Sequence, residues 1–226
     1  MAISSLLKAA GCGVCLAALG CGGNSTDCLI VQLQNADPKV RQASARALGN
    51  PPHDVPAAVA ALTAAVSDPD YEVREEAAQS LGQIGAAAKS SLVALEGALR
   101  DRHRSVRTTA ALAIYSIDTH RRSYVPVLCR ALQAGDGPVF LEVAQMGSAA
   151  EWAVPTLTSL LSHKQPSIRA LAAKTLGGIG APAASALSSL QLRARDNHAA
   201  VRKAARIAIE RIASTDDEVV EANTTR

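Results

Sequence analysis

The residues best suited to chemistry in this sequence are its five cysteines. Cys12 and Cys15 form a CxxC pair, the spacing of dithiol redox sites. They lie in an uncharged run from Ala9 to Gly23, which is typical of a secretory signal peptide that is removed from the mature protein. We therefore exclude the redox interpretation. Cys28 and Cys129 are far apart in the chain, so no disulfide framework is predicted.

Cys21 is the cysteine for which the sequence predicts a modification. Residues 16–21, LAALGC, resemble the lipobox of bacterial lipoproteins, in which small residues admit the signal peptidase and the following cysteine is acylated. Ala18 stands where these proteins usually carry leucine, so plain secretory cleavage is the alternative. The resemblance implies a signal peptide over residues 1–20, a lipidated tether over residues 21–25, and an exported, membrane-anchored protein.

Motifs for nucleotide chemistry are not supported by their context. Gly178–Ala183 resembles part of a dinucleotide fingerprint, but that motif needs a preceding strand, and a helix is expected here. No glycine-rich loop ends in Lys-Ser or Lys-Thr, so we exclude a P-loop. We expect no cofactor and no small-molecule substrate. A formal charge of +3 and an aromatic content of 2% also argue against a nucleic-acid partner.

An internal repeat in the sequence predicts the secondary-structure elements that would position any site. An aliphatic residue followed by arginine recurs every 33 residues, and this aliphatic residue is the reference position of each repeat below. The reference positions are Val40, Val73, Val106, Val139, Ile168 and Val201. In the fourth repeat Phe140 replaces the arginine, and only 29 residues separate Val139 from Ile168. That repeat has lost four residues, about one helical turn.

Each repeat has the pattern of two helices. A leucine stands 11 residues before every reference position. In five of the six repeats a small residue stands five after it, and in five a large aliphatic residue stands eight after it, in helical spacing. Asp37-Pro38 is typical of the start of a second helix, with aspartate as cap and proline in the first turn. Gly49, Gly82–Gly85 and Gly177–Gly180 are predicted to end second helices in the left-handed conformation. The 48% apolar content, mostly Ala and Leu, also favours an all-α fold.

These columns resemble HEAT-like repeats of the phycobilisome lyase type over residues 26–213. The resemblance implies an α-solenoid of about six helical-hairpin repeats. It also implies that the repeat arginines are structural and bond to neighbouring acidic or carbonyl groups, Arg41 beside Asp37 and Arg74 beside Asp68 or Asp70. Residues 214–226 are predicted to form a disordered acidic tail.

The same resemblance leaves an enzyme as the alternative function, since relatives with such repeats include bilin lyases and protein hydroxylases. None of the five histidines is followed by glutamate, the pair with which HEAT-repeat hydroxylases bind iron. No cluster of nucleophile, base and orienting acid can be assembled. We therefore expect no metal site and no catalysis, and a membrane-tethered scaffold or adaptor for a protein partner.

Candidate partner-binding residues come from two parts of the sequence. Aromatic residues gather around the fourth repeat, where they either fill the space left by the shortened helix or form a recognition site. They are Tyr115, Tyr124, Phe140 and Trp152. Other candidates are second-helix residues expected to point outward. They are Glu75, Glu76, Gln79, Thr108, Thr109, Lys174 and Lys203.

Basic residues form two groups. The first contains Arg100, Arg102, Arg104 and Arg107, with Arg121 and Arg122 nearby; the second contains Arg193, Arg195, Arg202, Lys203, Arg206 and Arg211. Such groups usually form a solvated face. Contact with anionic lipid headgroups or with an acidic partner is the alternative.

Overall fold

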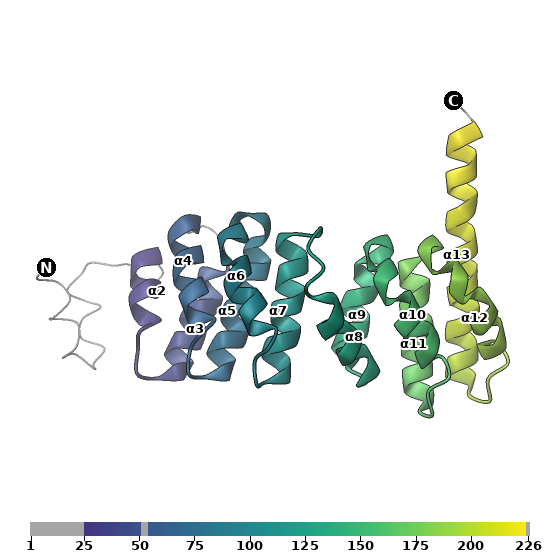
Figure 1. Cartoon of the computed structure of the whole chain (residues 1–226), viewed down its shortest axis with the longest axis horizontal. Coiled ribbons are helices and arrows are strands. Elements are labelled where there is room, and N and C mark those ends of the chain that lie inside the picture. Colours follow the sequence, from purple (N-terminus) through teal and green to yellow (C-terminus); the bar gives the residue numbers. More distant parts are fainter. Residues whose placement is uncertain (1–24, 51–53, 225–226) are drawn as a thin grey trace, which may run out of the picture. The chain divides into compact units, whose positions relative to one another are not determined.

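The computed structural model describes residues 25–50 and 54–224, with side chains described through Ser214. All regular elements in these residues are helical, and they divide into two units that meet in the chain at Tyr124 and Val125. Figure 1 shows that each unit is a row of paired helices. The fold is therefore an α-solenoid of helical-hairpin repeats, as the sequence predicts.

The N-terminal unit contains three hairpins. Its first helices are α2 (Thr26–Gln32), α4 (Val55–Ala65) and α6 (Leu92–Ala98), the last preceded by the 3-10 helix η1 (Gly85–Ser91). Its second helices are α3 (Pro38–Leu48), α5 (Tyr71–Ile84) and α7 (Arg104–Ile117). Helix α5 packs between α3 and α7, so neighbouring repeats join mainly through their second helices.

The C-terminal unit repeats this arrangement. Its first helices are α8 (Val125–Gln133), α10 (Val154–Leu160) and α12 (Leu187–Arg193), and η2 (Gly147–Ala153) and η3 (Ala181–Ala186) precede the last two. Its second helices are α9 (Gly137–Gln145), α11 (Pro166–Ile179) and α13 (Ala199–Thr224). Helix α11 packs against both α9 and α13.

The leucine column of the first helices forms the core of both units. All six members are buried; they are Leu29, Leu62, Leu95, Leu128, Leu157 and Leu190. Burying a leucine side chain contributes about 1.5–3 kcal/mol. The predicted core position of this leucine column is therefore confirmed in every repeat.

Capping residues begin and end the second helices largely as predicted. Asp37 accepts a hydrogen bond from the Lys39 backbone N–H, and Asp70 caps α5 in the same way. Gly85 and Gly180 end their helices with φ of 68° and 78°. Gly49 departs from the prediction, because it follows α3 with an ordinary φ of −72°. Its lack of a side chain serves packing, since a Cβ there would lie 2.6 Å from Ser80 Oγ.

The fourth repeat has the shortened second helix that the sequence predicts. Helix α9 has 9 residues, whereas α5, α7 and α11 each have 14. It is followed by Gly147 with φ of 55°, so it ends with a glycine as α5 and α11 do. The loss of about one turn keeps the apolar face of the helix directed to the core.

Helix α13 extends beyond position 213, where the sequence analysis places the end of the repeat domain. Its backbone is helical to Thr224, through most of the segment predicted to be disordered. The physical reason is that no glycine or proline occurs between Ala199 and Thr224 to stop the helix.

Candidate binding surface

Arginines in the second helices join successive repeats. The arginine column consists of Arg41, Arg74, Arg107, Arg169 and Arg202; of these, Arg41, Arg74 and Arg169 bind a carboxylate of the next repeat. Arg74 binds Asp101 of the next repeat through two bonds, Nε to Oδ2 at 2.7 Å and Nη2 to Oδ1 at 2.9 Å. Arg41 binds Asp68 in the same way, with both bonds at 2.8 Å. In the C-terminal unit Arg169 binds Asp196, with bonds of 2.9 and 2.8 Å.

The carboxylate partners correct the sequence expectation. Arg41 does not pair with Asp37, and Arg74 does not pair with Asp70, because in each case the bound carboxylate belongs to the following repeat. The expected bonds to nearby carbonyl groups are confirmed. Nη1 of Arg74 donates to the carbonyl oxygens of Asp68 and Pro69, at 2.9 and 3.1 Å. The arginine therefore fastens its own loop and the next repeat together.

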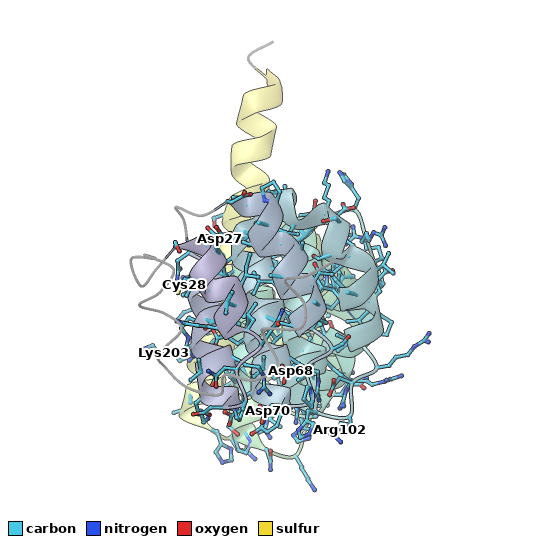
Figure 2. All side chains as sticks on the ribbon, turned by 90° about the vertical axis from the view of Figure 1, so that its left-hand side faces the viewer. Asp27, Cys28, Asp68, Asp70, Arg102 and Lys203 are labelled. Carbon is cyan, nitrogen blue, oxygen red and sulfur yellow. The ribbon has the colours of Figure 1, made fainter. Side chains whose placement is uncertain are left out.

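The bound aspartates also shape the loops that lead into the second helices. Asp101 accepts a hydrogen bond from the His103 backbone N–H at 2.7 Å, and Asp196 accepts one from His198 at 3.0 Å. Side-chain acceptors two residues before the N–H are typical of Asx turns. One carboxylate thus sets both the loop and the repeat-to-repeat contact. Asp68, Asp70 and Arg102 lie at the same edge of the N-terminal unit (Figure 2).

The ion pairs alter the acidity of two of these aspartates. The Arg169 side-chain bonds, opposed by burial, lower the pKa of Asp196 to about 2. For Asp101, burial raises the pKa, but the bonds from Arg74 and the His103 backbone outweigh it and hold the pKa below its ordinary value. Both aspartates are therefore charged acceptors, which make stronger hydrogen bonds than neutral ones.

Small residues bring neighbouring second helices close together. A Cβ on Gly82 would lie 3.0 Å from the Cα of Ala113, and one on Gly177 would lie 2.8 Å from the Cα of Ala208. Buried hydroxyl groups also bridge neighbouring second helices: Ser80 Oγ of α5 donates to the Ala45 carbonyl of α3 at 2.9 Å. These faces are occupied by repeat packing, so a partner can only contact the side chains that point away from them.

The predicted second-helix contacts divide between surface and core. Gln79, Lys174 and Lys203 are exposed, and Glu75 and Thr109 are partly exposed. The prediction is wrong for Glu76 and Thr108, which are buried. Glu76 is buried because Arg46 of the preceding repeat binds its carboxylate, with bonds of 3.0 and 2.6 Å.

The aromatic residues around the fourth repeat lie mainly in the core. Phe140 and Tyr124 are fully buried, and Trp152 is half-buried. Tyr124 packs edge to face against Tyr115, with ring centroids 5.7 Å apart. The burial of Phe140 and Tyr124 agrees with the packing alternative and removes these two side chains from the surface available to a partner.

The basic residues of the predicted patch have three different environments. Arg100, Arg102, Arg104 and Arg195 are exposed. Arg107 and Arg202 are held by backbone carbonyls, with Nη1 of Arg107 donating to Asp101 at 2.7 Å. Arg193 lies 3.4 Å from Asp196, beside the Arg169 pair.

Sequence reasoning missed two surface contacts, one between the second and third repeats and one between the first and second. Tyr71 stacks on His103 with ring centroids 4.2 Å apart, and Lys39 pairs with Glu72. Both contacts join helix starts in successive repeats. A signal was present, because Lys39 and Glu72 are separated by 33 residues, one repeat period.

Other kinds of site would need reactive thiols, metal-ligating clusters or membrane-spanning helices in the described residues. Cys28 and Cys129 are free thiols there. Within the same residues, no group of three or more His, Cys, Asp or Glu side chains is placed to hold a metal ion. None of the helices described has the length and apolarity needed to cross a membrane.

Comparisons with known proteins agree with this architecture. The sequence matches the family of HEAT repeats over residues 26–114 and 142–210; the residues between these ranges include α8 and the first part of α9 in the irregular fourth repeat. None of the curated proteins matches the sequence.

Several solved structures are similar. An engineered protein has 21% identity and a TM-score of 0.53, with 84% of this chain and 96% of its own covered. A designed armadillo repeat protein has 17% identity and a TM-score of 0.50, with 81% and 98% covered. The complex of CpcE and CpcF of phycocyanin lyase from Nostoc sp. has 22% identity, a TM-score of 0.49, and 80% and 74% covered.

Proposed function

This chain belongs to the HEAT-repeat family, and on that premise we propose that it is a non-catalytic scaffold that binds another protein at a membrane. The observation that supports the proposal most is that the second helices carry two separate sets of side chains. One set of side chains is used to join repeats, as in Arg74 with Asp101, and a second set, including Gln79 and Lys174, is exposed. Stacked repeats that share a core offer extended surfaces for partners.

The exposed second-helix residue at position six differs between the second and fifth repeats, whereas the buried residue at position five is the same. Position six after the reference is Gln79 in the second repeat and Lys174 in the fifth, while position five is alanine in both. Variation confined to exposed positions allows one fold to carry a specific surface. We therefore place the partner on the second helices.

The membrane tether in this proposal is a lipid on Cys21. Cys21 and the signal peptide lie outside the residues that the structure describes, so the support comes from the lipobox-like sequence alone. A diacylglyceryl thioether with an additional acyl chain would provide stable anchoring. Metabolic labelling with an alkyne fatty acid tests it directly: the label and the membrane fraction should both be lost in Cys21→Ser. A labelled Cys21→Ser chain would refute the assignment.

Site-specific photocrosslinking in the cells that produce the protein tests the scaffold itself. A photoreactive amino acid at position 79 or 174 should give a discrete crosslinked protein, while position 60, exposed on the first helix α4, serves as the matched control. Equal crosslinking at position 60 would contradict a second-helix surface. A bound metal or bilin in the purified full chain would contradict the non-catalytic assignment.

A further inference from the structure

Arg202 on α13 is held in the same way as the arginines that bind carboxylates. Its Nη1 donates to the carbonyl oxygens of Asp196 and Asn197, at 2.8 and 3.1 Å. Arg169 makes the equivalent bonds to His163 and Lys164, at 2.8 and 3.2 Å. These two carbonyl bonds fix the plane and direction of the guanidinium before any carboxylate binds.

The other edge of the Arg202 guanidinium differs from that of Arg169. Nε and Nη2 of Arg169 donate hydrogen bonds to Oδ2 and Oδ1 of Asp196. Among residues 25–50 and 54–214, whose side chains the structure describes, no carboxylate forms an ion pair with Arg202. Arg202 thus presents a preorganised two-nitrogen edge, the geometry that suits a carboxylate.

The surroundings of this edge are basic where equivalent surfaces in other repeats are apolar. Five residues after the reference position stands a fully buried alanine in four repeats; they are Ala45, Ala78, Ala111 and Ala173. In the sixth repeat this position is Arg206, which is exposed and one helical turn from Arg202. Lys203 is exposed next to them, and Glu210 limits the basic surface one turn further on.

We propose that Arg202 and Arg206 form a docking site for an acidic segment of the protein partner, with an Asp or Glu carboxylate bound by the Arg202 edge. The inference rests on the proposed scaffold function and specifies the chemistry of the partner. Charge complementarity supports it, because three arginines of the same column already bind aspartate in this geometry. A guanidinium edge selects planar carboxylates, and Arg206 adds attraction for further negative charge.

Two other occupants fit the site less well. After Glu210, the next acidic residues of this chain are Asp216 and Asp217. They follow on the same helix at about 21 Å along its axis, at 1.5 Å per residue, and a continuous helix cannot bend back. In a second copy, the residue equivalent to Asp196 in the first repeat is Asn35. Asn35 carries no charge, and its Oδ1 already accepts the Asp37 N–H at 2.9 Å.

Fluorescence anisotropy with the purified full chain tests the site. The probe is a fluorescein-labelled hexa-aspartate peptide, and the hexa-asparagine peptide is the neutral control. We expect the paired substitution Arg202→Gln with Arg206→Gln to weaken hexa-aspartate binding at least about tenfold, and Arg202→Lys to weaken it several-fold, because lysine keeps the charge but lacks the two-nitrogen edge. If the Arg202 variants lose helicity, Arg206→Gln alone tests the site, because Arg206 is exposed and its loss should still weaken hexa-aspartate binding.

Arg195→Gln is the matched control, because Arg195 is an exposed arginine of the same repeat and the substitution removes the same single charge. It should change hexa-aspartate binding less than about twofold. An equal loss in Arg195→Gln would reduce the effect to net charge and overturn the proposal. So would no hexa-aspartate binding at all, arginine-dependent binding only to phosphatidylglycerol vesicles, or self-association that disappears in Arg202→Gln.

The proposed scaffold and this site fail in different ways. If crosslinks from positions 79 and 174 persist while the arginine variants bind hexa-aspartate normally, the docking site is wrong and the scaffold remains. If crosslinks are absent at every position, the scaffold itself is wrong.

Discussion

The arginines at equivalent positions in the fifth and sixth repeats, Arg169 and Arg202, have different surroundings. Arg169 is 11% exposed and its guanidinium is enclosed by two loop carbonyls and the carboxylate of Asp196. Arg202 keeps the two carbonyl bonds but has no such carboxylate in the described residues. The difference separates two roles of the column: the carbonyl bonds organise the loop within a repeat, and the carboxylate joins one repeat to the next.

The helix surfaces around these two arginines differ in the same direction. Ala173 and Gly177 follow Arg169 on α11 and are buried against α13, whereas Arg206 and Glu210 occupy those positions on α13. Small residues are needed where another second helix approaches. Charged residues at the same positions are compatible only with solvent or with a charged partner. This face of α13 therefore lacks the small residues with which α11 receives a neighbouring second helix.

The largest difference between the two arginines should appear in stability. Arg169→Ala should lower the free energy of unfolding by about 3 kcal/mol, because the Asp196 carboxylate, 4% exposed, loses its two-bond partner and keeps only the longer contact to Arg193 and the loop contacts to His198. Urea unfolding followed by circular dichroism measures it. Lys39→Ala, which removes a pair with 69% and 36% exposed partners, is the control and should leave the free energy of unfolding nearly unchanged. Equal effects would contradict the importance of burial.

A smaller effect should follow from the acidity of Asp196. Its pKa is about 2 in the folded protein, below the ordinary value of about 3.9, so its contribution is present above pH 4 and is lost as the pH falls toward 2. We expect a loss of about 2 kcal/mol over that interval, measured by urea unfolding at a series of pH values. Asp196→Asn should flatten this part of the profile, and an unchanged profile would show that the pair with Arg169 is not the cause.

The sequence predicts one part of this arrangement well and another part poorly. Leu62 and Ala78 are identified as core because burial on a helix follows its own periodicity, which a single sequence contains. For Arg74 the sequence predicts a carboxylate partner in the wrong repeat, because the bond to Asp101 depends on how one hairpin stacks on the next. An offset of 27 residues between Arg and Asp recurs in all three pairs and could have indicated it. The burial of Glu76 likewise depends on Arg46 of another repeat.

Close helix packing in the fifth repeat gives the next prediction. Gly177→Ala should destabilise the protein by about 1 kcal/mol, because the new Cβ would meet the Ala208 backbone at 2.8 Å and the gain in helix propensity offsets only part of the strain. Gly97→Ala in α6 is the matched control. Nothing lies within 4 Å of that Cβ, so it should stabilise by about 0.5–1 kcal/mol. Thermal unfolding of both variants measures the difference, and the same sign for both would contradict the close approach of α11 and α13.

The smallest stability effect is expected at Arg202, where the comparison becomes sharpest. Arg202→Gln loses the bonds to two loop carbonyls but leaves no carboxylate without its partner, so the free energy of unfolding should fall by less than about 1 kcal/mol. The same substitution at Arg169 should cost several times more. If urea unfolding shows equal losses, the carbonyl bonds dominate in both repeats and the carboxylate contributes little. If Arg202→Gln is nearly neutral, the residue contributes little to folding, and its fixed guanidinium is free to serve binding.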